Sequence, residues 1–276
     1  MITVRSLHIY PVKSCRGIDV DTAEVGPTGF RHDRQWMVVD ADGTFISQRS
    51  HPVLARIGTR IEGDLLILEA PGLSPLEIAC GNQPGDRRSV VVWKDACEAV
   101  SAGPRAAAWF SSLLGTPCEL VRQQDDGIRR VDPLYADPED RVAFADGFPF
   151  LLINGASVDD LNRRLVDPVP ADRFRANIVV EGADAYSEDR WTSLQIGGIG
   201  FRVAKPCARC VVITTDQKDG ARSDEPLRTL AGYRRLGGKV LFGQNLVHNS
   251  TGTICTDVEV RVVERRQTDH DDSSLF

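Results

Sequence analysis

Short apolar runs separated by turn residues recur through the first hundred positions of the chain. Runs of this length, rich in Val, Ile and Leu, favour β-strands. They occupy residues 2–12, 34–40, 44–48, 64–70 and 89–95. Asp42-Gly43 stands between the second and third of these runs, and this dipeptide is typical of the tight turn of a β-hairpin. The first third of the chain is therefore predicted to be largely β.

The pattern becomes helical over residues 102–115. Pro104 suits the first turn of a helix, alanines follow close behind it, and Gly115 is placed to end it. Residues 122–147 are then rich in Asp, Pro and Gly and predict a linker or a long loop. Long ordered loops in compact proteins are disproportionately functional.

The second half returns to strands, with two further helices. A short buried strand and a helix are predicted over residues 148–167, where Ser157 and Asp160 have the spacing of a capping box. Another helix is predicted over 224–238, with Pro226 near its start. Its apolar face would be formed by Leu227, Leu230 and Leu236. Strands are expected at residues 174–182, at 193–206 with a turn at Gly197 and Gly198, and within 239–265.

Many short strands with few helices do not form the repeating units of a parallel α/β fold. They indicate a β-rich α+β protein built on a closed or partly closed β-barrel with a few decorating helices. A chain of 276 residues is long enough for one large domain or for two domains that share an interface.

Charge and hydropathy exclude several classes of protein. The formal net charge is −6, which opposes nucleic-acid binding, although a local basic pocket is compatible with it. The chain opens MITVRSLHIYPVKS without an uninterrupted apolar segment, and no run of about 20 apolar residues follows. We therefore expect a cytoplasmic protein with no nucleic-acid partner and no membrane partner. Seven scattered cysteines suit a reducing compartment.

Cys207 and Cys210 stand three positions apart in AKPCARCVVITTD. A structural zinc site would require a second pair of ligands, and the chain has no other CxxC and no paired histidines. A redox-active pair normally begins a helix, whereas the residues that follow here are β-branched. The sequence thus favours two ordinary core cysteines, or one thiolate that serves as a ligand, over zinc binding and dithiol exchange. Lys205 and Arg209 flank the pair with positive charge, which favours a thiolate suited to a soft or high-valent metal.

A second group of residues could bind an anion. Lys13 and Ser14 follow a proline at a predicted strand end and precede Gly17, and this arrangement is typical of a phosphate cradle. Arg34 and Arg175 flank predicted strands and could each hold an anionic group through two parallel hydrogen bonds.

Six stretches, in order, give the chain a resemblance to a known family. They are YPVKSCRG, RHDRQW, FADGFPFLLIN, FRANIVV, CARCVVITTD and LFGQN. Together they resemble the MOSC-domain proteins, and in particular the group with an N-terminal β-barrel part that includes the mitochondrial amidoxime-reducing component and soluble bacterial relatives. The resemblance implies an N-terminal MOSC-associated β domain over residues 1–122, a MOSC domain over 123–264 and a flexible tail over 265–276.

The resemblance also implies roles for individual residues. Cys210 would be the protein ligand of molybdenum in a molybdenum cofactor (Mo-molybdopterin), and Cys207 a neighbour that does not bind the metal. Asp146 would lie beside the metal and take part in catalysis. The cofactor would be held by Lys13, Ser14, Arg34, Asp146, Gly147, Arg175, Asn177 and Arg209. Gly147 and Phe148 stand where the mitochondrial forms have hydroxyl residues.

The expected activity is that of a molybdenum-dependent oxidoreductase. Its substrates would be N-hydroxylated compounds such as amidoximes, hydroxylamines or N-hydroxylated bases, and a separate flavin or iron–sulfur reductase would supply electrons. Two alternatives stay open. One is a persulfide carrier in cofactor maturation, acting through Cys210 or Cys207, and the other is a carrier of the cofactor without catalytic activity.

Overall fold

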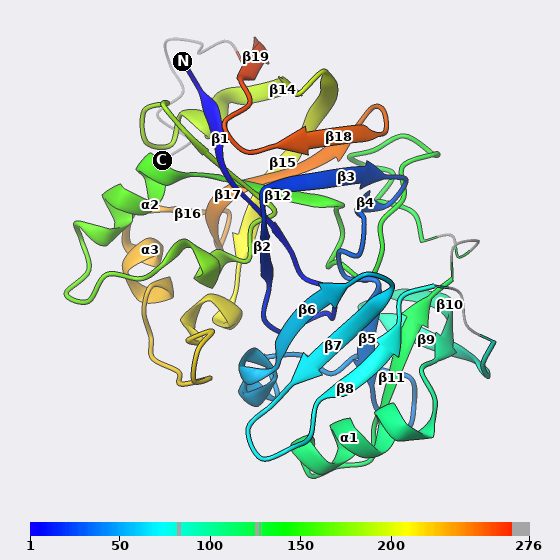
Figure 1. The fold of residues 1–276 in the computed structure, drawn as a ribbon. Helices are drawn as coiled ribbons and strands as arrows, with labels where there is room; N and C mark the ends of the chain where they lie inside the picture. Colours follow the sequence, from blue (N-terminus) through cyan, green and yellow to red (C-terminus); the bar gives the residue numbers. More distant parts are fainter. Residues whose placement is uncertain (82–83, 125–126, 128, 267–276) are drawn as a thin grey trace.

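The chain forms two lobes in the computed structural model, which describes residues 1–81, 84–124, 127 and 129–266 (Figure 1). One lobe, called here the barrel lobe, contains strands from both ends of the chain. The other, the 36–123 lobe, contains β5 to β11 and α1. The tail expected at 265–276 lies, from residue 267 on, outside the described residues.

A nine-stranded sheet is the largest among the described residues, and it forms most of the barrel lobe. Its main path runs through β19 (Val260–Arg265), β14 (Trp191–Ile196), β15 (Ile199–Arg209), β17 (Lys239–His248), β12 (Phe150–Asn154), β13 (Ile178–Glu181), β1 (Thr3–Ile9) and β2 (Ile18–Val20). The short β16 (Arg235–Leu236) pairs with β17. A second sheet in this lobe consists of β18 (Gly252–Cys255), β3 (Thr22–Gly26) and β4 (Gly29–Phe30).

Both of these sheets bury side chains in one hydrophobic core. Phe150 lies at its centre, with ring centroids 4.9 Å from Phe30 and 5.4 Å from Phe201. Phe30 belongs to the small sheet, and the other two belong to the large sheet. All three are fully buried in this core, so burial of aromatic surface holds the two sheets together.

The 36–123 lobe is built from two antiparallel sheets and one helix. Its first sheet has the order β5 (Trp36–Val39), β11 (Glu119–Gln123), β10 (Asp95–Ser101) and β9 (Arg87–Val92). Its second sheet has the order β6 (Gly58–Glu62), β7 (Leu65–Glu69) and β8 (Leu76–Ala79). Helix α1 (Pro104–Leu114) buries Ala106 and Phe110 against this lobe.

The β-rich α+β class and most of the predicted elements are confirmed. Helix α1 begins at Pro104 and ends where Gly115 adopts φ 68°, a conformation that glycine enters without steric cost. The hairpin through Gly197 and Gly198 joins β14 to β15, with φ values of 54° and 85° at the two glycines.

Three local predictions are wrong. Residues 44–48 form only isolated bridges from Thr44 and Phe45 in place of a strand. Helix α2 (Gly155–Asn162) is capped by Asn154, whose side chain accepts from the amide of Ala156, and not by the predicted capping box. The Ser157 hydroxyl donates instead to buried Glu188.

The third wrong prediction concerns the end of the last helix. Helix α3 spans only Leu227–Tyr233. Leu230 is fully buried, whereas Leu236 belongs to β16 and is 37% exposed. Pairing of residues 235–236 with β17 therefore takes precedence over continuation of the helix.

Strands from the first 30 residues pair with strands of the second half. Residues 3–7 of β1 pair with β13, and residues 22–25 of β3 pair with β18. The domain division at residue 122 stays a prediction. The structure places β1 and β19, the first and last strands of the described chain, in the same nine-stranded sheet of the barrel lobe (Figure 1).

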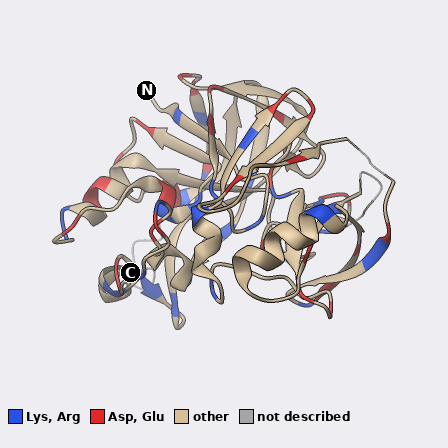
Figure 2. Ribbon diagram, turned by 60° about the horizontal axis from the view of Figure 1, so that its bottom comes forward, with Lys and Arg blue, Asp and Glu red and all other residues tan. Residues whose placement is uncertain are grey.

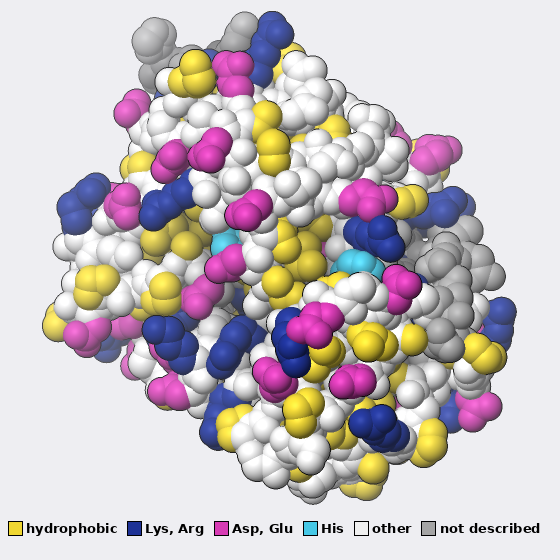
Figure 3. Space-filling view, viewed as in Figure 1, with side chains coloured by type: hydrophobic (Ala, Val, Ile, Leu, Met, Phe, Trp, Pro, Cys, Tyr) yellow, Lys and Arg dark blue, Asp and Glu magenta, His cyan; other side chains and the backbone are white. Residues whose placement is uncertain are grey.

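The surface shown in Figure 3 carries charges of both signs, interspersed with single apolar side chains. Within the described part of the chain, no helix is long and apolar enough to cross a membrane.

Glu188 is a buried carboxylate with an incomplete set of partners. One of its oxygens accepts from Ser157 at 2.7 Å, while the other has no hydrogen-bond partner among the described residues. Burial raises the pKa of Glu188 from its ordinary value of 4.5 to about 7, and the nearby Asp189 adds to this increase.

The stability of the protein should therefore depend on pH through Glu188. Between about pH 4.5 and 7 the unfolded chain has released this proton and the folded chain has not, so the free energy of unfolding falls as pH rises. Urea unfolding at pH 5 and pH 7.5 should show a larger decrease for the wild type than for Glu188→Gln. Parallel decreases in the two proteins would show that Glu188 titrates normally.

Candidate functional site

A pocket of about 190 Å³ lies where the two lobes meet. It is lined by Lys13, Ser14, Arg34, Arg49, Ala145, Asp146, Gly147, Phe148, Phe150, Leu151, Phe174, Arg175, Asn177, Cys207, Ala208, Arg209, Cys210, Val212, Ile213 and Asn245. Every site residue predicted from the sequence is in this set. Figure 2 shows Lys and Arg positions gathered in the middle of the molecule, between the lobes.

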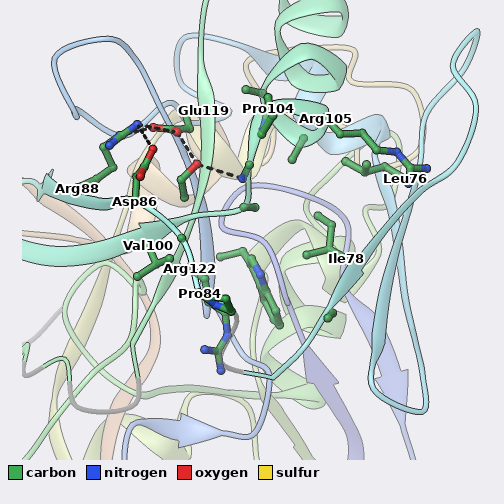
Figure 4. A pocket seen from close by; sticks show the side chains of 18 of the residues that line it. Leu76, Ile78, Pro84, Asp86, Arg88, Val100, Pro104, Arg105, Glu119 and Arg122 are labelled. Atoms are coloured by element: carbon green, nitrogen blue, oxygen red, sulfur yellow. Dashed lines mark hydrogen bonds and ion pairs between the residues drawn. The ribbon is translucent and has the colours of Figure 1, made fainter.

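A larger hollow, of about 870 Å³, lies within the 36–123 lobe and shares no lining residue with this pocket (Figure 4). Its described lining contains no Cys or His. Arg88 is paired there with Glu119 at 2.9 Å, and Glu119 accepts from Ser101 (Figure 4). These charged groups are already engaged with one another. The smaller pocket, whose lining includes cysteine thiols, is therefore the candidate functional site.

Backbone strain is concentrated around the Cys210 pocket. Ser14, Arg34 and Arg175 line it and have φ values of 72°, 48° and 54°. L-residues rarely adopt such values, and strained residues cluster at functional sites. In each case the strained backbone belongs to a residue that the sequence analysis assigns to the cofactor.

The planar guanidinium of Arg34 joins several residues at the pocket by hydrogen bonds. Its Nη1 donates to both oxygens of buried Asp33, at 2.8 and 2.7 Å, and to Asn177 Oδ1 at 2.9 Å. Its Nη2 donates to the carbonyl of Arg175 at 2.9 Å. The Tyr10 ring lies against the guanidinium groups of Arg34 and Arg175, at 4.2 and 4.4 Å from its centroid.

Arg175 presents a buried positive charge to the pocket. Burial lowers the pKa of Arg175 to about 10, and repulsion from Arg34 contributes, so the guanidinium remains charged near neutrality. Its Nη1 donates to Gln217 Oε1 at 3.0 Å. Buried Gln48 donates to the same oxygen and to the carbonyl of Ser14. Two glutamines that the sequence analysis did not select therefore hold Arg175 and Ser14 in place.

Lys13 is a buried cation with a carboxylate partner. Its ammonium donates to the carbonyl of Phe144 at 2.8 Å and contacts Asp146. Burial lowers the pKa of Lys13, and the Asp146 carboxylate opposes this effect. The Lys13 ammonium and the Arg49 guanidinium hold the pKa of the Asp146 carboxyl below its usual range. Asp146 is therefore an ionised acceptor at the pocket surface, with 56% of its side chain exposed.

Arg49 brings a cation from the 36–123 lobe to Cys210. Its Nη2 lies 3.3 Å from Cys210 Sγ and 3.3 Å from Asp146 Oδ2. Its guanidinium lies over the Trp93 ring, 4.4 Å from the centroid. Arg49 is not among the residues predicted from the sequence, because an arginine in a turn between two predicted strands gives no local sign of contact with residue 210.

The second cysteine has a different partner. Arg209 Nη1 donates to Cys207 Sγ at 3.0 Å, and Arg209 Nη2 donates to the carbonyl of Phe174 at 2.7 Å. Lys205, which flanks the pair in sequence, lies over the Tyr135 ring and is absent from the lining of this pocket. Cys207 and Cys210 thus both reach the pocket, and each contacts its own arginine.

The donor set suits an anionic ligand that carries a metal with other ligands of its own. The described residues place no three His, Cys, Asp or Glu side chains together as metal ligands. A metal held here would thus have one or two cysteine thiols as soft donors and would need further ligands from outside the protein. The surrounding lysine and arginines favour a negatively charged group.

Comparison with known proteins covers both parts of the chain. Residues 1–117 match the MOSC N-terminal beta barrel domain, and residues 139–261 match the MOSC domain. The chain is 37% identical over 273 residues to mitochondrial amidoxime-reducing component 1 of Homo sapiens, covering 91% of this chain and 80% of that protein. It is 36% identical over 245 residues to mitochondrial amidoxime reducing component 2 of Bos taurus, covering 84% and 72% of the two chains.

A second group of relatives is much longer than this chain. The chain is 36% identical over 263 residues to molybdenum cofactor sulfurase of Oryza sativa subsp. japonica, covering 88% of this chain and 32% of that protein. The similarity thus spans about a third of the sulfurase.

Removal of Arg34 should destabilise the whole protein. Arg34→Met leaves buried Asp33 without its cation, and loss of one partner of a buried ion pair costs about 3–5 kcal/mol. Asp33→Asn combined with Arg34→Met should cost less than the sum of the two single changes. Urea unfolding of the four proteins measures this coupling, and strictly additive losses would contradict the role assigned to the pair.

Proposed function

The chain belongs to the MOSC family, and from that premise we propose that it is a molybdenum-cofactor-dependent reductase of N-hydroxylated compounds. One observation supports this most strongly. Two cysteine thiols and five cations line one pocket with a single carboxylate. The cations are Lys13, Arg34, Arg49, Arg175 and Arg209, and the carboxylate is Asp146.

The phosphate of the cofactor would be held by Lys13, Ser14 and Arg175. Lys13 and Arg175 are less than a tenth exposed, and charge-assisted hydrogen bonds are stronger in a site that excludes water. Arg34 and Asn177 would act by holding Arg175 and the neighbouring strands. Arg209 would contact the pterin part. Cys210 would supply the single protein ligand of the metal.

The bound cofactor would supply two-electron oxygen removal. For an amidoxime, the N–O bond breaks, two electrons and two protons enter, and the products are an amidine and water. Asp146 is an ionised acceptor beside the Cys210 thiol, so it would orient the substrate by accepting hydrogen bonds from its N–H or O–H groups. Arg49 would donate to the departing oxygen. A separate flavin or iron–sulfur reductase would supply the electrons.

A persulfide carrier is the second candidate function. The similarity to molybdenum cofactor sulfurases and the Cys207 thiol in the same pocket both favour it. In that case one of the two thiols would hold a sulfur atom and transfer it, and the chain would not retain molybdenum.

The activity is tested with the intact protein purified with its metal. We expect close to one molybdenum per chain, and reduction of benzamidoxime to benzamidine with dithionite-reduced methyl viologen as electron donor. A transient persulfide on Cys207 or Cys210 in protein without molybdenum would support the carrier. Bound molybdopterin with no turnover by any donor would indicate a carrier of the cofactor.

The two cysteines should differ in metal retention. Cys210→Ser removes the proposed ligand and should lose most of the molybdenum and the reductase activity, while far-UV circular dichroism shows the folded protein. Cys207→Ser is the matched control and should retain most of its metal. Equal molybdenum in Cys210→Ser and the wild type would refute the ligand assignment.

Removal of a buried cation should weaken cofactor retention. Lys13→Ala and Arg175→Ala each delete a charge-assisted contact worth about 1.5–3 kcal/mol. Pterin released by denaturation and measured by fluorescence should be lower in both variants than in the wild type. Unchanged pterin in both would remove the support for phosphate binding by these residues.

A further inference from the structure

A second cavity adjoins the Cys210 pocket and opens beside Asp146. Its volume is about 740 Å³, and it shares Asp146, Gly147 and Phe148 with the pocket. Its lining is completed by Trp93, Lys94, Asp95, Ala96, Arg129, Arg130, Val131, Asp132, Pro133 and Lys205. This set is called here the adjoining cavity.

The two volumes indicate that the Cys210 pocket and the adjoining cavity would hold different parts of a substrate. Small-molecule sites usually occupy about 300–1,000 Å³, and the Cys210 pocket, at about 190 Å³, is below that range. A substrate whose reacting end reaches Asp146 must keep the rest of its body elsewhere. The adjoining cavity is large enough and begins at the same residue.

Gly147 lies where the two cavities meet. No atom lies within 4 Å of the position that a Cβ would take at this residue, and its φ lies outside the left-handed region. The backbone therefore does not require glycine here. Because Gly147 lines both cavities, the missing side chain leaves open the space through which a substrate would reach Asp146.

Aromatic surface lines the adjoining cavity. The Trp93 indole is 49% exposed and is held by the ring of Phe45, with centroids 5.1 Å apart, and by Arg49. The Phe148 ring packs edge-on against Tyr135, with centroids 6.2 Å apart. An exposed indole fixed by its neighbours is a ready surface on which a flat ring can stack.

The charges of the adjoining cavity are unbalanced. Arg129 is buried and paired with Asp95 at 2.9 Å, and Asp146 is paired with Lys13. No ion pair joins Lys94, Arg130 or Lys205 to another residue that the structure describes, and Asp132 is the one acid left in the lining. The Lys205 ammonium lies 4.1 Å from the centroid of Tyr135 and 5.0 Å from that of Phe148. Lys205 thus lies next to the aromatic surface.

We propose that the adjoining cavity holds the body of the substrate, and that the preferred substrates are aromatic N-hydroxylated compounds that carry a negatively charged group. Gly147 sets the size of the body that can pass, and Lys205 attracts the negative group. This inference rests on the proposed reductase function. It gives Gly147 a role toward the substrate, whereas the sequence analysis assigned it to the cofactor.

Two amidoximes of different size test the role of Gly147. In Gly147→Val, the ratio of KM for benzamidoxime to KM for acetamidoxime should rise at least tenfold over the wild type, and Gly147→Ala should give a smaller rise. Molybdenum content is measured in each variant. Binding of benzamidoxime to unreduced protein is followed by the fluorescence of Trp93, with Trp93→Leu as the blank.

A charged analogue tests the role of Lys205. The KM for 4-carboxybenzamidoxime should be severalfold lower than for benzamidoxime in the wild type, and this preference should shrink at high salt. Lys205→Met should abolish it. Lys239→Met, at an exposed position of β17 outside both cavities, should retain it.

The outcomes separate this inference from the function on which it rests. A molybdenum-containing wild type that reduces none of the three amidoximes refutes the reductase and this inference together. Reduction of all three with an unchanged KM ratio in Gly147→Val, or loss of molybdenum from that variant, overturns the inference alone. An equal preference for the carboxylated compound in Lys205→Met and Lys239→Met overturns the assigned role of Lys205.

Discussion

The buried ion pair between Asp33 and Arg34 is the contact on which the geometry of the pocket depends. Arg34 joins Asp33, which precedes β5, to Asn177 and the carbonyl of Arg175, which precede β13. A carboxylate as buried as Asp33 is costly without a cation, so the pair fixes these segments in one arrangement. The strained backbone of Arg34 and Arg175 is maintained by the same contacts.

Local signals in the sequence predicted the elements that depend on local chemistry. Pro104 and Gly115 predicted where α1 begins and ends to within two residues, and Gly197-Gly198 predicted a hairpin, because caps and tight turns require particular residues. The end of α3 could not be read in this way, because residues 235–236 leave the helix to pair with β17. Strands from the first 30 residues pair with strands of the second half. This pairing joins distant segments, so no local sequence pattern could predict it.

The site residues also divide into those that were predicted from the sequence and those that depend on long-range contacts. The residues taken from the family resemblance all line one pocket, although they come from segments far apart in the sequence. Arg49, Gln48 and Gln217 could not be predicted from the sequence, because the contacts that bring them to the site join residues 34 to 169 positions apart. Such contacts also join the 36–123 lobe to the barrel lobe, so the pocket depends on both lobes.

The central claim is that the Cys210 sulfur completes the coordination of a molybdenum ion whose other sulfur ligands come from the cofactor. X-ray absorption at the molybdenum edge of the purified protein counts the sulfur neighbours directly. We predict three sulfur ligands in the wild type and two in any molybdenum that Cys210→Ser retains. Two sulfur ligands in the wild type, or the same number in both proteins, would contradict the account.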